Sequence, residues 1–90
     1  MQITSGTTPT IVFLLVSSTD DKTAVTGLAP TVTLSKAGGA FAAATNAASE
    51  IGSGFYKVAI TATESNTAGA LAIIATATGA DVWRDIHQVL

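Results

Sequence analysis

The amino-acid sequence predicts an all-β domain, folded as an antiparallel β-sandwich. Three observations predict it: short segments in which apolar and polar residues alternate, turn residues about every ten positions between them, and no segment with the amphipathic stripe of a helix. The chain has 90 residues, the size of one small domain. No interval between the predicted strands suits a crossover helix, so we expect about six or seven short strands and no parallel α/β architecture.

Two strands are predicted in the first part of the chain. The segment Thr8–Ser17 is β-branched and apolar at both alternating sets of positions. Such a strand is expected to be covered on both faces, by the core on one side and by a neighbouring molecule on the other. The segment Thr31–Lys36 alternates instead, which places Val32 and Leu34 in the core and the residues between them outside.

The alanine-rich segment Ala40–Ala48 is the ambiguous part of the chain. Alanine favours helix, but this segment has no amphipathic stripe, and polar residues interrupt it. It also follows Gly38 and Gly39, a pair typical of a hairpin turn. We therefore expect a strand or irregular structure over Ala40–Ala44, with a one-turn helix as the alternative.

Three further strands are predicted in the second half of the chain. Each follows a turn that contains glycine or a short polar connection. Their ranges are Phe55–Thr63, Gly69–Thr78 and Val82–Leu90. Alternation assigns the inward-facing sets of the first two strands, which are Tyr56, Val58 and Ile60, and Leu71, Ile73 and Ala75.

The charge content is low for a protein in water. Charged residues make up 11% of the chain, where about 25% is typical of soluble domains. Alanine and threonine together supply more than a third of the residues. Two interpretations stay open: much of the surface faces other subunits, or the surface is an uncharged, threonine-rich one that remains in contact with water.

Several classes of function are disfavoured by the composition. The cations are spread along the chain, so no basic patch for nucleic acid is expected; they are Lys22, Lys36, Lys57 and Arg84. The apolar run Ile11–Val16 is too short for a signal peptide or a membrane span. The chain has no cysteine, which excludes disulfides and thiolate metal sites. We expect a soluble protein made in the cytoplasm.

Chemistry-bearing residues are few and do not form a recognisable motif. His87 is the only histidine, and alternation puts Asp85 on the same face, but such a pair is typical of an ordinary polar strand. Asp20 and Asp21 form an acidic pair in a loop, with no third acidic residue nearby in sequence. The segment Gly52–Gly54 lacks the lysine and helix start of a phosphate-binding loop. We predict a protein that is not an enzyme and has no cofactor and no bound metal.

Aromatic residues are candidates for contacts with partners. Tyr56 begins a strand shortly after Gly54, which is similar to the tyrosine corner of immunoglobulin-like sandwiches. Phe55 and Trp83 are candidates for outward-facing anchors, but a thin, alanine-rich core also needs large side chains, so a core position stays open for both. We take Thr8, Phe55 and Trp83 as the candidate interface residues.

Four segments carry a resemblance to virion proteins of tailed bacteriophages. The segments are VTLSKAGGAF at 32–41, EIGSGFYKV at 50–58, TESNTAGAL at 63–71 and ATATGAD at 75–81. Each is short and made of common residues, and together the resemblance covers about residues 9–90. It implies an immunoglobulin-like β domain over residues 11–90. Residues 1–10 are polar and lack a periodic apolar pattern, so we expect them to form an arm that becomes ordered on contact with a neighbour.

The resemblance also implies a role in the virus particle. Because the chain holds almost nothing besides the sandwich, a small capsid decoration (cement) protein is expected, which binds and reinforces coat subunits. Its partners would be the major capsid or tail protein, and it would form a homo-oligomer on the particle after synthesis in the host cytoplasm. The alternative is an adhesion module of the tail, baseplate or fibre, which would bind host carbohydrate through Trp83 and Phe55 with Asp81, Asp85 or Asn66.

Overall fold

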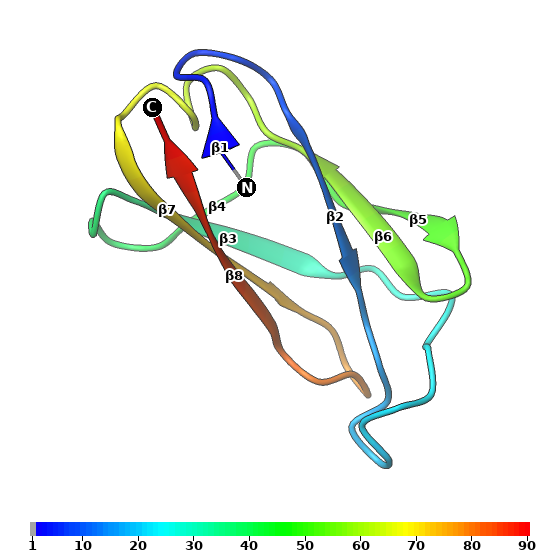
Figure 1. The fold of residues 1–90 in the computed structure, drawn as a ribbon. Helices are drawn as coiled ribbons and strands as arrows, with labels where there is room; N and C mark the ends of the chain where they lie inside the picture. The colour runs from blue at the N-terminus through cyan, green and yellow to red at the C-terminus, as the bar shows by residue number, and fades with distance from the viewer. Residues whose placement is uncertain (1) are drawn as a thin grey trace.

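The computed structural model describes residues 2–90 and consists of two packed β-sheets (Figure 1). All regular elements in these residues are strands: β1 (Gln2–Ile3), β2 (Thr10–Leu14), β3 (Thr31–Lys36), β4 (Ala42–Ala43), β5 (Ser49–Gly52), β6 (Phe55–Ala59), β7 (Gly69–Thr76) and β8 (Trp83–Val89). The larger sheet has the order β1-β8-β7-β3-β4, and the smaller has the order β2-β6-β5. The predicted all-β, two-sheet architecture is confirmed. Strand pairs are antiparallel except β1 and β8, which run parallel.

The core lies between the inner faces of the two sheets. The inward-facing residues predicted for β3, β6 and β7 are all buried, which confirms those assignments. Strand β2 adds Ile11 and Phe13 to the same core, and Leu15 follows directly after it. Alternation therefore suffices to place these side chains, because each strand has one face against the other sheet.

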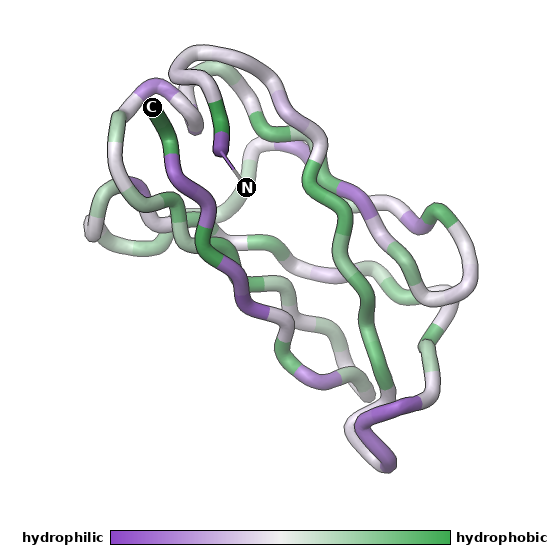
Figure 2. Tube along the Cα trace, viewed as in Figure 1, coloured by the Kyte–Doolittle hydropathy of each residue, from purple (hydrophilic) through white to green (hydrophobic). Residues whose placement is uncertain are grey.

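Strand β2 differs from the expectation in one respect. It is shorter than Thr8–Ser17, and its burial alternates: Ile11 and Phe13 face the core, whereas Val12 and Leu14 are exposed. Figure 2 shows β2 as hydrophobic along most of its length, unlike the alternating β8. The sequence pattern indicates two apolar faces, but the described part of the molecule covers only one of them.

The alanine-rich segment contributes little regular structure. Only Ala42–Ala43 forms a strand, β4, which pairs with β3 at the edge of the larger sheet. The next strand, β5, was not predicted as a strand, and it pairs with β6 through the tight turn at Gly52–Gly54. In that turn Gly54 has φ of 86°, and a Cβ added there would lie 2.5 Å from the Cβ of Ala24. The turn therefore needs glycine at this position.

Residues 2–10 lie against the sandwich, although we expected the first ten residues to form a separate arm. Ile3 is 2% exposed in the core, and its strand pairs with the end of β8. The amide of Gly6 donates to the carbonyl of Ser65, and the Ser65 hydroxyl donates to the carbonyl of Thr7. A single apolar residue gives no periodic pattern in the sequence, yet its burial and these hydrogen bonds hold the segment against the sandwich.

Tyr56 ties the connection between β2 and β3 to the core. Its hydroxyl donates to the carbonyl of Val25 at 2.8 Å and accepts from the amide of Leu28 at 3.2 Å. The expected bonding of the phenol to backbone is present, but Tyr56 lies within β6 and pairs with Phe13 across the sheet. The buried ring and its two bonds hold a long irregular segment in place.

Candidate binding surfaces

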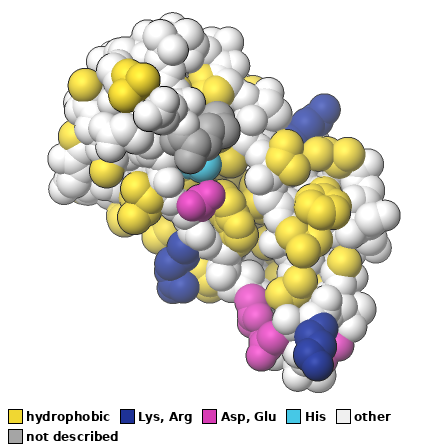
Figure 3. Space-filling view, in the orientation of Figure 1, with side chains coloured by type: hydrophobic (Ala, Val, Ile, Leu, Met, Phe, Trp, Pro, Cys, Tyr) yellow, Lys and Arg dark blue, Asp and Glu magenta, His cyan; other side chains and the backbone are white. Residues whose placement is uncertain are grey.

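The outer face of the smaller sheet carries a cluster of exposed apolar side chains, which we call the apolar face. It consists of Val12, Leu14, Ile51 and Phe55, whose exposed fractions are 52%, 39%, 56% and 44%. Leu14 lies opposite Phe55 in the register of β2 and β6, and Ile51 precedes Gly52, which also lies opposite Phe55. In Figure 3, hydrophobic side chains gather over the region of β2, β6 and β5.

The apolar face arises from the same alternation that builds the core. Odd-numbered residues of β2 point inward, so the even-numbered ones, Val12 and Leu14, must point outward. Opposite Val12 lies Lys57, the one charged residue of β6. Adjacent apolar side chains on an exposed sheet face mark a binding site more often than isolated ones do.

The three candidate interface residues do not lie together. Phe55 belongs to the apolar face. Trp83 lies on β8 of the other sheet, where its half-buried ring stacks on Phe13 with the ring centroids 5.0 Å apart. Thr8 is exposed beside Pro9, whose carbonyl accepts from the amide of Ile60, at the end of β6 remote from Phe55. A single carbohydrate site that combines Trp83 and Phe55 is therefore not formed in this structure.

Sequence reasoning missed Val12, Leu14 and Ile51 as surface residues. The signal for the first two was present, because a strand that is apolar at both alternating sets must expose one set unless something else covers it. Ile51 gave no signal, because its strand was not predicted.

The outer face of the larger sheet holds a shallow hollow of about 430 Å³. Its apolar lining comes from Phe41, Ala72, Ile73, Ile74 and Ile86, and Arg84 and Asp85 also line it. Phe41 precedes β4 and the other residues lie on β7 and β8, so the hollow spans several strands. Among the described residues, two large apolar side chains are exposed at this hollow, Phe41 and Ile86, compared with four on the apolar face.

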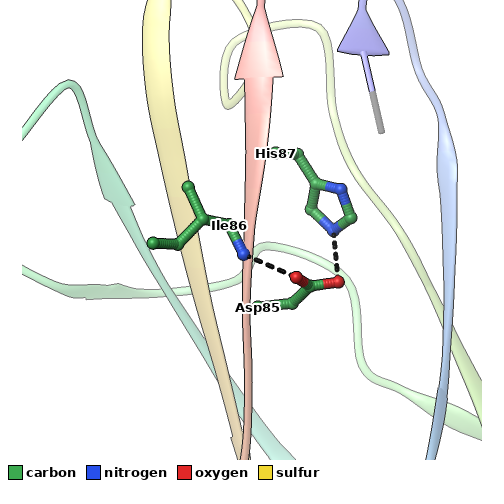
Figure 4. Close-up of polar contacts among 3 residues, drawn as sticks. All are labelled: Asp85, Ile86 and His87. Atoms are coloured by element: carbon green, nitrogen blue, oxygen red, sulfur yellow. Dashed lines mark hydrogen bonds and ion pairs between the residues drawn. The ribbon is translucent and has the colours of Figure 1, made fainter.

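Asp85 and His87 lie on the same side of β8, as alternation predicts (Figure 4). The Nε2 atom of His87 is 3.5 Å from Oδ2 of Asp85, and the other carboxylate oxygen, Oδ1, accepts from the amide of Ile86 at 2.8 Å. Burial lowers the pKa of His87, and the negative charge of Asp85 opposes this shift. Among the described residues neither ring nitrogen of His87 has a hydrogen-bond partner, so no hydroxyl is placed for it to deprotonate.

The acidic loop after β2 is ordered by its own hydrogen bonds. Asp20 accepts from the amides of Lys22 and Thr23 and from the Thr23 hydroxyl, which lowers the pKa of Asp20 to about 2. The fold brings Asp81 to this loop, where a hydrogen bond and the charge of Asp21 raise the pKa of Asp81. Within residues 2–90, no group of three acidic or histidine side chains is arranged to hold a metal ion.

A scan against protein-family models finds no match for this chain, and a search of curated proteins finds no similar sequence. In the described part of the chain, no helix has the length and apolar character needed to cross a membrane.

Proposed function

We propose that the chain is an immunoglobulin-like structural module of a bacteriophage particle, which acts by binding and not by catalysis. The observation that carries the proposal is the apolar face, because four large apolar side chains on one exposed sheet face are suited to contact with another protein. The resemblance of residues 9–90 to phage virion proteins supports a coat subunit as the partner and capsid decoration as the role.

The sheet topology supports the immunoglobulin-like part of the proposal. If the strands are labelled A, B, C, C′, D, E, F and G in chain order, the smaller sheet is B-E-D and the larger contains G-F-C-C′. These are the neighbour orders of an immunoglobulin sandwich. The difference lies in the first strand, which pairs with the last strand here.

The low charge content fits a protein that is surrounded by copies and coat subunits. The strands β2, β5 and β6 contain two charged residues, Glu50 and Lys57, so bringing this face against an apolar coat surface would remove few charges from water. Burial of the four side chains would contribute about 25 cal/mol for each Å² of apolar area removed from water, and the freedom lost on association opposes this gain.

Binding to capsid shells tests the proposal. The purified chain is mixed with shells that lack it, and the bound fraction is measured by co-sedimentation. We expect saturable binding that Phe55→Asp weakens by at least about tenfold, because a charge would be buried in an apolar contact. The matched control is Thr31→Asp, which adds the same charge at an exposed position of the larger sheet.

Two outcomes would contradict the proposal. Shells that bind none of the wild-type chain would rule out capsid decoration. Equal loss of binding in Phe55→Asp and Thr31→Asp would mean that added charge, and not the apolar face, determines binding. Circular dichroism of both variants ensures that they are compared as folded proteins.

A further inference from the structure

The edge of β8 offers backbone groups to a partner. On one side β8 pairs with β7, and on the other, within residues 2–90, β1 pairs with it opposite Gln88 and Val89. The amide of Leu90 donates to the carbonyl of Ile3, and the carbonyl of Leu90 accepts from the amide of Ser5. Since alternate residues of a strand direct their backbone groups to the same side, Ile86 and Arg84 face this edge as well.

The hydrogen bond of Ile86 agrees with this direction. Its amide does not enter the ladder to β7; it donates to Oδ1 of the neighbouring Asp85 at 2.8 Å (Figure 4). An unpaired edge N–H is a template for pairing with another chain, and a charged side chain beside it limits promiscuous pairing. Asp85 thus occupies the place that the carbonyl of an added strand would take.

The open edge has limits at both ends. At one end it meets β1, and at the other the amide of Asp81 donates to the carbonyl of Val16 and Ala80 bridges to Ser17. The opening therefore admits an extended segment of about four residues. A second copy of β8 does not fit, because antiparallel pairing centred on Asp85 would bring the residues before its own strand onto the position of β1.

On the face of β8 that carries Asp85 and His87 the charge favours a cationic segment, because the side chain of Arg84 lies on the opposite face. The side chain of Asp85 is 51% exposed, and the only charged or titratable partner within 4 Å among the described residues is His87. Burial lowers the pKa of His87, which disfavours an imidazolium that would compete for the carboxylate of Asp85. An added strand that displaces Asp85 from the Ile86 amide leaves the carboxylate without that donor. A lysine or arginine side chain on the added strand then donates to the carboxylate in its place.

We propose that the open edge of β8 at Arg84–Ile86 binds a short extended segment of another polypeptide that carries a lysine or arginine next to Asp85. The recognition is strand addition, in which backbone hydrogen bonds supply affinity and Asp85 supplies selectivity. Trp83, half-buried at the start of the same edge, offers apolar contact to the segment. This site is separate from the apolar face and does not depend on the proposed function.

Peptide titration of the full chain, followed by NMR of its amides, tests the proposal. The probes are acetyl-TVKVT-amide and acetyl-TVEVT-amide, which differ only in the charge of the central residue. We expect the lysine peptide to shift the amide signals of Arg84 and Ile86 at millimolar concentration and to bind at least about fivefold more tightly than the glutamate peptide. In Asp85→Asn, which keeps an acceptor for the Ile86 amide, the two peptides should bind equally.

Two controls separate strand addition from non-specific contact. Proline is tolerated in an edge strand where the amide faces away from the ladder. We therefore expect Ile86→Pro to fold but to lose peptide binding. The control Val12→Pro, at the outer edge of β2, should fold and still bind the peptide. If Ile86→Pro does not fold, a lysine peptide N-methylated at alternate amides replaces that variant as the control, and it should not bind. Absence of shifts at Arg84 and Ile86, unchanged charge preference in Asp85→Asn, or binding of the N-methylated peptide would each overturn the proposal.

Discussion

The apolar face and the open edge of β8 present two different kinds of surface to a partner. The apolar face lies on the smaller sheet and is made of side chains, Val12, Leu14, Ile51 and Phe55, whose burial is non-directional. The edge of β8 lies on the larger sheet and is made of backbone groups, which bind only with defined direction and register. The first surface suits tight contact with a preformed protein, and the second suits an extended segment.

Both surfaces lie over the same layer of stacked aromatic rings. Removal of a ring from that layer should lower the free energy of unfolding more than any other change proposed here. Phe13 stacks on Trp83, which begins β8, and on Tyr56, which follows Phe55. We expect Phe13→Ala to lower the free energy of unfolding by about 3–5 kcal/mol, because it leaves a cavity under both surfaces. Urea denaturation followed by tryptophan fluorescence measures the change. A loss below about 1 kcal/mol would mean that the two surfaces do not share this support.

The hydrogen bonds of Tyr56 to the β2–β3 connection should contribute less to the free energy of unfolding than the ring of Phe13 does. Tyr56→Phe keeps the ring but leaves the carbonyl of Val25 and the amide of Leu28 without the hydroxyl. We expect a loss of about 1–3 kcal/mol in the free energy of unfolding, measured in the same way. An unchanged value would show that water replaces the hydroxyl at no cost.

His87 should make the stability of the β8 region depend on pH. Because burial lowers the pKa of folded His87, the unfolded chain, whose histidine pKa is about 6.5, takes up a proton that the folded chain does not. The contribution is complete above about pH 6.5 and is lost as the pH falls toward the lowered folded pKa. Asp20, with a pKa of about 2, loses its own contribution only below about pH 4.

The variant His87→Leu isolates this effect. Denaturation of both proteins between pH 7.5 and 5 should give a free energy of unfolding that falls for the wild type more than for the variant. Parallel curves would contradict the account of a buried, neutral imidazole.

Substitution on the apolar face should have the smallest effect on folding. Phe55→Ser removes an exposed ring, so we expect the free energy of unfolding to change by less than about 1 kcal/mol while self-association and adsorption decrease. Thermal denaturation and light scattering measure the two properties. A large loss of stability would mean that Phe55 contributes to the fold and is not simply an exposed residue available for contact with a partner.

The fold was predictable where one face of a strand is buried and the other is not. Alternation was sufficient for β3, β6 and β7, and the glycine turns marked their ends. It failed at β1, where one buried residue, Ile3, makes no period, and at β5, whose residues are exposed and whose place is set by pairing with β6. In these strands tertiary contacts decide the structure, and no local pattern records them.

The candidate surfaces were predictable in part. Phe55 was a candidate from the sequence, and the apolar alternate positions of β2 contained the signal for Val12 and Leu14. The edge of β8 could not be foreseen, because it depends on where β1 stops and on which way the Ile86 amide points. Such features follow from pairing between distant segments and from register.

A reconstruction of the virus particle proposed for this chain, made with the chain bound, tests the central claim most directly. The proposed function predicts a density for each sandwich with the sheet β2-β6-β5 turned toward a coat subunit and the apolar face at the contact. A particle in which this sheet faces solvent, and another surface of the sandwich makes the contact, would contradict it.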